Sequence, residues 1–349
     1  MKIARHVRRL EGYVPGEQPK SKSVVKLNTN ENPYPPSPAC AAALKGFDLD
    51  RLRRYPDPDF AELREALAKL NGTRAENVFV GNGSDEVLSI AARCFVEDDE
   101  TIGSLDPSYS LYKTLAAIRN VPWEGAAAPA DAGKRVSLFL LTNPNAPTGE
   151  FREPAEIAAF ARKFKGVVIV DEAYADFARA NCMSLATAPG NRNLIVMRTF
   201  SKSYSLAGLR VGYCVGPADL IAAMYKVKDS YNVDAVAQAV ALAAIKDQAW
   251  MRANVAKVVK TRGRLAEALR RLGWDIIPSE SNFLFARPAP KGVPFRAAAA
   301  TAAAVFDALK AQNIFVRYFR GPKTGDRIRI TIGTEAQVKK LLAAIGKLK

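Results

Sequence analysis

The sequence has little histidine and few cysteines. Its 349 residues include a single histidine, His6, and four cysteines, namely Cys40, Cys94, Cys182 and Cys214. No two cysteines lie within four residues of each other, whereas structural zinc sites usually have closely paired ligands. Disulfide frameworks are typical of shorter secreted chains with a higher cysteine density. We therefore expect no metal site and four free thiols.

Long apolar runs are also missing. No stretch reaches the roughly 18 apolar residues that a membrane helix requires. The basic segment MKIARHVRRLEGY at the N-terminus is not followed by an apolar run, so it does not resemble a secretory signal. We expect a cytoplasmic protein that does not enter a membrane. The length and the 48% hydrophobic content are enough for a sizeable core and favour two domains.

Positive charge is abundant, with 51 Lys and Arg against 35 Asp and Glu and a net charge of +16. Such an excess can bind nucleic acid or concentrate anionic small molecules in a cleft. The basic residues are scattered, and the densest cluster, at residues 51–54, is short. Because no nucleic-acid recognition motif is present, we expect small anionic ligands and no nucleic-acid partner.

Strand and helix patterns alternate along most of the chain, which is typical of an α/β fold with a largely parallel sheet. Strands are predicted at 78–80, 101–105, 136–141, 167–170, 194–197 and 211–215. Long helices are predicted at 218–228 and 235–272, followed by strands near 283–286, 314–317 and 327–332. We predict an N-terminal arm with part of a small domain (1–40), a large domain (41–235) and a small C-terminal domain (236–349).

Polar motifs follow the carboxyl ends of several predicted strands, where open α/β sheets bind ligands. In the segment 201–210, Lys202 lies beside serines, and a lysine with a lowered pKa can form an imine with an aldehyde. Ser201 and Arg210 can hold a phosphate. Taken alone, Lys202 would be an ordinary surface lysine. The motifs around it favour a cofactor site.

Asp171 ends a buried strand, where a carboxylate is costly unless it is paired. A pyridinium nitrogen would be a suitable partner, and Tyr174 could reach the phenolic oxygen of the same ring. The alternative for Asp171 is a helix N-cap. The turn 81–86, with sequence GNGSDE, could bring backbone N–H groups to a phosphate, although a surface turn has a similar composition.

In combination and in this order, the motifs of the chain resemble those of fold-type I enzymes that use pyridoxal 5′-phosphate (PLP), and among these the histidinol-phosphate aminotransferases. The resemblance extends from residue 12 to the C-terminus. It rests on the segments 12–19, 27–33, 54–56, 81–86, 106–109, 143–149, 171–174, 201–210 and 327–333. It implies a large domain with a mostly parallel sheet and a smaller α/β domain.

The resemblance implies a role for each matching residue. Lys202 would form a Schiff base with PLP and transfer the proton, Asp171 would pair with the pyridinium nitrogen, and Tyr174 would contact the ring oxygen. Further cofactor contacts would come from Tyr109, stacked on the ring, from Ser84, Asp85, Ser201 and Arg210 at the phosphate, and from Tyr55 of the partner subunit in a homodimer. The family turn has an asparagine where this chain has Ala146, so either Asn145 replaces that contact or Tyr174 makes it alone.

The implied reaction is transamination between L-histidinol phosphate and 2-oxoglutarate, in histidine biosynthesis. Substrate contacts would come from Tyr13, Asn30, Arg317 and Arg329, with the arginines binding the anionic ends of the phosphorylated amino alcohol and of glutamate. Two alternatives remain open from the sequence: an aromatic amino-acid aminotransferase and a threonine-phosphate decarboxylase of the same fold.

Overall fold

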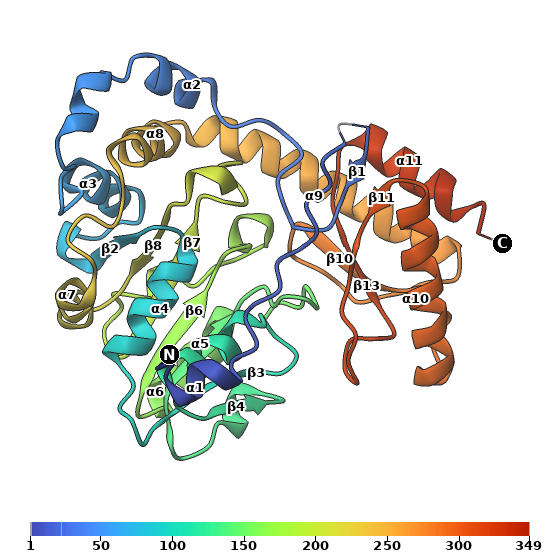
Figure 1. The fold of residues 1–349 in the computed structure, drawn as a ribbon, viewed down its shortest axis with the longest axis horizontal. Helices are drawn as coiled ribbons and strands as arrows, with labels where there is room; N and C mark the ends of the chain where they lie inside the picture. The colour runs from blue at the N-terminus through green and yellow to red at the C-terminus, as the bar shows by residue number, and fades with distance from the viewer. Residues whose placement is uncertain (1, 22, 349) are drawn as a thin grey trace.

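A seven-stranded sheet forms the centre of the larger part of the molecule (Figure 1). The computed structural model describes residues 2–21 and 23–348. In spatial order the strands are β2 (Val78–Gly81), β8 (Gly212–Val215), β7 (Leu194–Thr199), β6 (Val167–Asp171), β5 (Val136–Thr142), β3 (Thr101–Leu105) and β4 (Trp123–Ala126). β8 runs antiparallel to both of its neighbours, and the other pairs are parallel. The predicted largely parallel sheet is confirmed.

Both faces of this sheet are covered by helices, which explains why its central strands are almost entirely apolar. Alternate residues of a strand point to opposite faces. Leu138 and Leu140 of β5 therefore pack with α4 (Ser84–Cys94), α5 (Leu111–Arg119) and α7 (Ala218–Val227). Phe139 and Leu141 belong to the core on the other face, which includes α3 (Ala61–Leu70), α6 (Pro154–Lys163) and α8 (Ala235–Lys246).

A second, antiparallel sheet forms in the C-terminal part, in the order β12 (Arg317–Tyr318), β13 (Ile328–Thr331), β10 (Phe283–Arg287) and β9 (Asp275–Ile276). Helices α9 (Gln248–Arg271), α10 (Phe295–Ala311) and α11 (Glu335–Ile345) pack against this part of the chain. The N-terminal segment reaches it as well, because β1 (Val25–Lys26) pairs in parallel with β11 (Ile314–Phe315). The domain boundaries given above remain a prediction.

The structure corrects two of the predicted elements. The helix predicted at 235–272 is interrupted at Asp247, whose carboxylate accepts the N–H of Trp250 and so caps the start of α9. The strand predicted at 314–317 is divided between β11 and β12, which belong to different sheets. Both interruptions are set by local capping and pairing that hydrophobic periodicity does not report.

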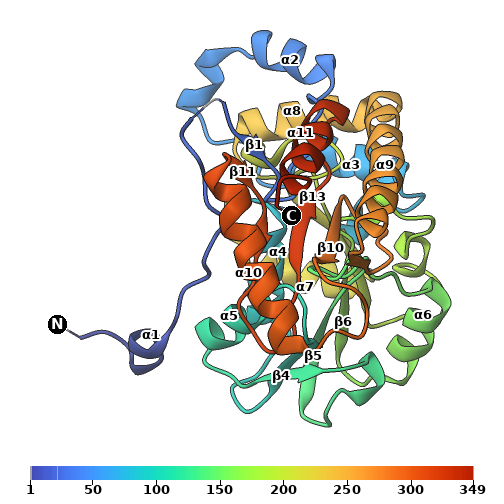
Figure 2. The same cartoon turned by 90° about the vertical axis from the view of Figure 1, so that its right-hand side faces the viewer.

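The remaining helices are short or peripheral. α1 (Arg5–Arg9) lies at the end of an extended N-terminal segment that projects from the body, as Figure 2 shows. α2 (Pro38–Lys45) packs on α8. Short 3₁₀ helices cover Leu49–Arg53, Ala75–Asn77, Pro129–Asp131, Ala175–Phe177, Met183–Leu185 and Ala207–Leu209. Across residues 2–21 and 23–348, no helix is long and apolar enough to span a bilayer.

Candidate active site

A cavity of about 560 Å³ lies at the carboxyl ends of the central strands. Thr142, Asp171 and Thr199, the last residues of β5, β6 and β7, line its floor. Its other walls come from α4, from the N-terminal segment and from the second sheet. Most of the residues predicted for the site line this cavity: Tyr13, Asn30, Ser84, Asp85, Tyr109, Asp171, Tyr174, Ser201, Lys202, Arg210, Arg317 and Arg329.

Lys202 is half-buried in the loop that follows β7. Its ammonium lies 3.4 Å from the carbonyl oxygen of Thr29, which accepts its hydrogen bond, and 5.9 Å from the centre of the Tyr174 ring. Burial, followed by the positive charge of Arg329, lowers the pKa of Lys202 to about 8. A substantial fraction of neutral amine is therefore present near neutral pH, as a nucleophilic lysine requires.

Asp171 is buried at the end of β6. Its Oδ1 accepts the N–H of Ala173 at 3.1 Å, and its Oδ2 accepts the hydroxyl of Tyr112 at 2.7 Å. Among the described residues no cationic side chain pairs with it. Burial raises the pKa of Asp171 to about 6, although both hydrogen bonds oppose that rise. An uncompensated buried carboxylate that faces a cavity is suited to a cationic ligand atom.

An anion-binding corner is formed where α4 begins. Gly83 precedes the helix and has no side chain to cap it, so the first N–H groups of α4 face the cavity. A Cβ on Gly83, whose φ is +81°, would lie 2.6 Å from Nη2 of Arg210, so glycine is what lets the guanidinium approach. The hydroxyl of Ser201 accepts a hydrogen bond from Thr199 and keeps its own proton for another partner. These groups together can hold a phosphate.

Tyr174 is held by the N-terminal segment. The side-chain amide of Asn30 donates to the Tyr174 hydroxyl at 2.9 Å, and Asn30 is in turn hydrogen-bonded to Thr331 of β13. The phenolic proton of Tyr174 is then free to be donated toward a ligand.

Tyr109 donates its hydroxyl proton to Asp85 at 3.3 Å. The rings of Tyr109 and Tyr13 pack edge to face, with their centres 5.8 Å apart.

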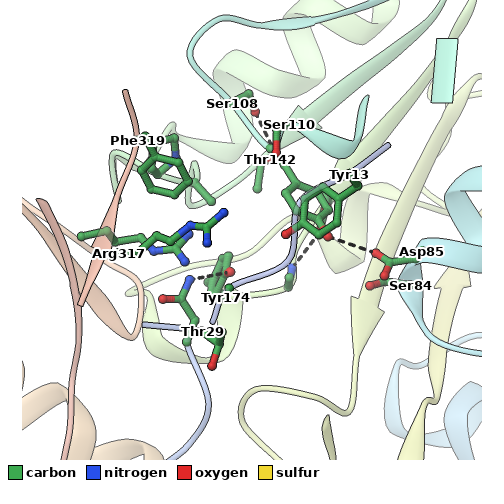
Figure 3. A pocket seen from close by; sticks show the side chains of 18 of the residues that line it. Tyr13, Thr29, Ser84, Asp85, Ser108, Ser110, Thr142, Tyr174, Arg317 and Phe319 are labelled. Atoms are coloured by element: carbon green, nitrogen blue, oxygen red, sulfur yellow. Dashed lines mark hydrogen bonds between the residues drawn. The ribbon is translucent and has the colours of Figure 1, made fainter. Parts of the chain in front are cut away.

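The opposite wall carries two arginines, as Figure 3 shows for Arg317 beside Phe319. Arg317 and Arg329 are directly opposite each other in the pairing of β12 with β13. Both guanidinium groups lie over the Phe319 ring, at 5.3 and 5.1 Å. In the described part of the chain they donate only to backbone carbonyls, of Val14, Pro15 and Asn28, and Arg329 Nε is buried without a partner. Burial lowers the pKa of Arg329.

Two residues named from the sequence do not line the cavity. Asn145 is buried, and its amide is fully used within the protein: it donates to Pro107 and Thr148 and accepts from Ser108. Ala146 lines the cavity instead, so Asn145 does not replace the contact of the family asparagine. Tyr55 is 80% exposed and stacks on Tyr231 at 4.3 Å, outside the cavity.

Sequence reasoning did not single out several of the polar residues that line the cavity or contact Asp171. Thr142 is the register partner of Asp171 in the pairing of β5 with β6, so its place at the end of a buried strand was a usable signal. Tyr112 lies one helical turn after Tyr109, on an otherwise apolar face of α5. Thr29, Phe319 and Trp123 also line the cavity. Within residues 2–21 and 23–348, no cluster of His, Cys, Asp and Glu could hold a metal ion.

Comparisons with known proteins agree on one family. The family model for aminotransferase class I and II matches residues 22–345. Histidinol-phosphate aminotransferase 1 of Nostoc sp. is 42% identical over 98% of this chain and 97% of its own length, and histidinol-phosphate aminotransferase 2 of Burkholderia mallei is 43% identical over the same shares. The solved histidinol-phosphate aminotransferase of Sinorhizobium meliloti, in complex with pyridoxal 5′-phosphate, has a TM-score of 0.84 at 25% identity and covers 93% of this chain and 91% of its own. This chain therefore belongs to the class I and II aminotransferases, and within them to the histidinol-phosphate aminotransferase family.

Proposed function

We propose that this protein uses PLP to transfer an amino group between L-histidinol phosphate and 2-oxoglutarate. The observation that carries the choice of substrate is the adjacent pair Arg317 and Arg329, two guanidinium groups facing the cavity without an acidic partner in the described chain. Such a pair can bind an anion, and we assign it to the phosphate of histidinol phosphate. The curated relatives that are 41 to 43% identical over nearly the whole chain are named for the same activity.

The side chains around the cavity fit PLP. Its phosphate would lie against the start of α4, Arg210 and Ser201, its ring nitrogen against Asp171, and its ring oxygen against the hydroxyl of Tyr174. When bound, PLP supplies an aldehyde that combines with amines and a ring that accepts the electrons of a broken C–H bond. The buried, unpaired carboxylate of Asp171 carries the negative charge that a protonated ring nitrogen needs.

The protein's own groups supply positioning and proton transfer. Lys202 would hold the cofactor through Nζ, and once the substrate amine has displaced it, the lowered pKa would let the free amine accept a proton from the substrate carbon and return it. Tyr174, fixed by Asn30, donates its phenolic proton to the ring oxygen. Because Asn145 is turned away and Ala146 has no polar side chain, Tyr174 makes this contact without an asparagine from the turn.

The substrate assignment predicts an unequal effect of replacing Arg317. Arg317→Ala should raise the KM for histidinol phosphate by about tenfold or more, which is the loss of a charge-assisted hydrogen bond to the phosphate, and should change the KM for 2-oxoglutarate, which has no phosphate, much less. Steady-state kinetics with each substrate varied separately measures both. Arg320→Ala, which removes an exposed arginine outside the cavity lining, is the matched control. Equal effects of Arg317→Ala on the two KM values would contradict the assignment.

A side-by-side assay tests the function itself. The purified protein, reconstituted with PLP, should transaminate histidinol phosphate with 2-oxoglutarate far faster than it transaminates phenylalanine, and it should release no carbon dioxide from threonine phosphate. A preference for phenylalanine would indicate an aromatic aminotransferase. Carbon dioxide release would indicate a decarboxylase of the same fold.

We further propose a homodimer in which Tyr55 completes the partner's phosphate site. Tyr55 is exposed and stacked on Tyr231, and the nearby Leu49 and Leu52 are exposed as well. Such a cluster of exposed apolar side chains is typical of an interface.

The four cysteines are free, as is usual in reducing compartments, which supports a cytoplasmic location.

Hybrid dimers test the shared site. Tyr55→Ala and Lys202→Ala chains, each inactive or weakly active alone, should recover about a quarter of wild-type activity when unfolded together, mixed in equal amounts and refolded, because half of the dimers are hybrids and each hybrid contains one intact site. Activity and size-exclusion chromatography measure the outcome. No recovery, with hybrid dimers present, would mean that Tyr55 serves its own subunit or none.

A further inference from the structure

Tyr112 has the position of a residue that controls Asp171. It lies on α5, is completely buried, and donates its hydroxyl proton to Asp171 Oδ2 at 2.7 Å. The same hydroxyl lies 2.6 Å from Oγ1 of Thr142. Both distances are typical of well-formed O–H···O hydrogen bonds, and neither Tyr112 nor Thr142 has a role in the function proposed above.

Further contacts between hydroxyl groups extend beyond Thr142 to the turn that carries Ala146. Thr142 Oγ1 lies 3.3 Å from Ser108 Oγ, and Ser108 donates to Asn145 Oδ1 at 3.0 Å. The orientation of the Asn145 amide is fixed because its Nδ2 donates to two other acceptors. Contacts between hydroxyl groups therefore extend from Asp171, which lines the cavity, to Asn145, which does not.

Counting the hydroxyl protons shows which group donates in each of these hydrogen bonds. A phenol has one proton to donate, so when Tyr112 donates to the carboxylate of Asp171, Thr142 must donate to Tyr112. The proton of Ser108 is donated to Asn145, so none remains for a hydrogen bond between Ser108 and Thr142, and the relay that reaches Asp171 consists of Thr142 and Tyr112. Each of the three hydroxyl groups then has an acceptor. This arrangement of hydrogen bonds stabilises the ionised form of Asp171.

We infer that Tyr112, oriented by Thr142, is a positioning residue that keeps Asp171 ionised and aims it at the cofactor nitrogen. The inference rests on the proposed PLP site. A hydrogen bond to the charged form of a carboxyl group favours that form, and here it counteracts the burial of Asp171. The other titratable groups that face Asp171 are Asp85 from α4, whose charge disfavours ionisation, and Lys202, whose charge favours it.

Binding of pyridoxamine 5′-phosphate to the cofactor-free full-length protein tests the inference. This probe carries an amine in place of the aldehyde, so the protonation of Lys202 does not limit its binding. Tyr112→Phe should raise its dissociation constant about twofold at pH 7 and about tenfold near pH 5, because losing a hydrogen bond to the charged form raises the pKa of Asp171 by about one unit from its value of about 6. The pH below which binding weakens should move upward by about one unit. The probe's phosphate titrates near pH 6 in every variant, so the difference between variants reports on Asp171.

Two further variants distinguish a relay from a packing effect. Thr142→Val keeps the shape of the side chain and should shift the dissociation constant and the pH profile in the same direction, by less. In the Tyr112→Phe background it should add little, because the two residues act through one hydrogen bond. Tyr225→Phe, which removes a partly buried phenol that packs on Phe79 of β2, three strands away from β6 in the sheet, is the control and should match the wild type.

Three outcomes decide the inference. Wild-type affinity and pH profile in Tyr112→Phe would overturn it, and so would fully additive effects of the two substitutions. Failure of the wild-type protein to bind the probe would instead refute the proposed PLP site. Thermal unfolding of each variant verifies that it is folded at the temperature of the measurement.

Discussion

Lys202→Ala is expected to abolish transamination, with kcat lower by at least about 10³-fold, the size of a positioned general base together with a covalent anchor. The structure gives Lys202 the properties that both tasks need: a half-buried amine in the cavity, a pKa lowered to about 8, and, in the described chain, a hydrogen bond only to a backbone carbonyl. The reconstituted variant should also lack the near-visible absorbance band of PLP bound covalently to a lysine.

The matched control for this prediction is Lys228→Ala. Lys228 also has a pKa lowered by burial, but it lies over the rings of Phe60 and Tyr225, outside the cavity lining. It should keep the absorbance band and the activity. A near-visible band that survives in Lys202→Ala would mean that another amine binds the aldehyde, and would remove Lys202 from the centre of the site.

The uptake of PLP by the cofactor-free wild type should depend on pH in a defined direction. Only the neutral amine of Lys202 attacks the aldehyde, so the rate should rise about tenfold for each pH unit below about 8 and level off above that value. Stopped-flow absorbance between pH 6 and 9 measures the rate. Arg329→Gln, which removes a neighbouring positive charge, should move the midpoint upward. A rate that does not change with pH would show that the ionisation of Lys202 does not limit the uptake of PLP.

The sequence was sufficient to predict the fold class and the residues at strand ends. Asp171 and Lys202 follow buried apolar strands, and adjacent parallel strands bring such positions to one edge of the sheet. A polar residue that ends a buried strand can therefore be assigned to the site from the sequence pattern alone. The predicted strands of the central sheet were therefore found, and the residues that follow them line one cavity.

Orientation of single side chains was beyond the reach of the sequence. Asn145 and Ala146 are neighbours, and only the path of the turn decides which of them faces the cavity. Tyr112 was missed because a tyrosine on an apolar helix face is usually a core residue. The role proposed for it rests on a 2.7 Å contact with Asp171, which lies 59 residues further along the chain. The role proposed for Tyr55 would depend on a second subunit, which a single sequence does not position.

Asp171→Asn should lower kcat by about 10² to 10³-fold, the cost of removing one preorganised electrostatic contact from an enclosed site, while PLP remains bound. Asparagine keeps the shape of the side chain and an oxygen for the Tyr112 hydroxyl, but its neutral amide lacks the charge that a protonated ring nitrogen requires. The phosphate corner and Lys202 are unchanged, so the near-visible band should persist. This separates the variant from Lys202→Ala, which should lose activity and band together.

The control for Asp171→Asn is Asp98→Asn, which removes an exposed carboxylate that pairs with Arg119 away from the cavity and should leave kcat unchanged. Asp171→Glu retains the charge at a displaced position and should recover part of the lost rate if charge is what matters. If Asp171→Asn instead retained kcat within about threefold of the wild type, the ring nitrogen would not need a charged partner. The buried, unpaired carboxylate would then be a structural cap on the N–H of Ala173, and the electronic role given to Asp171, Tyr112 and Thr142 would fail as a unit.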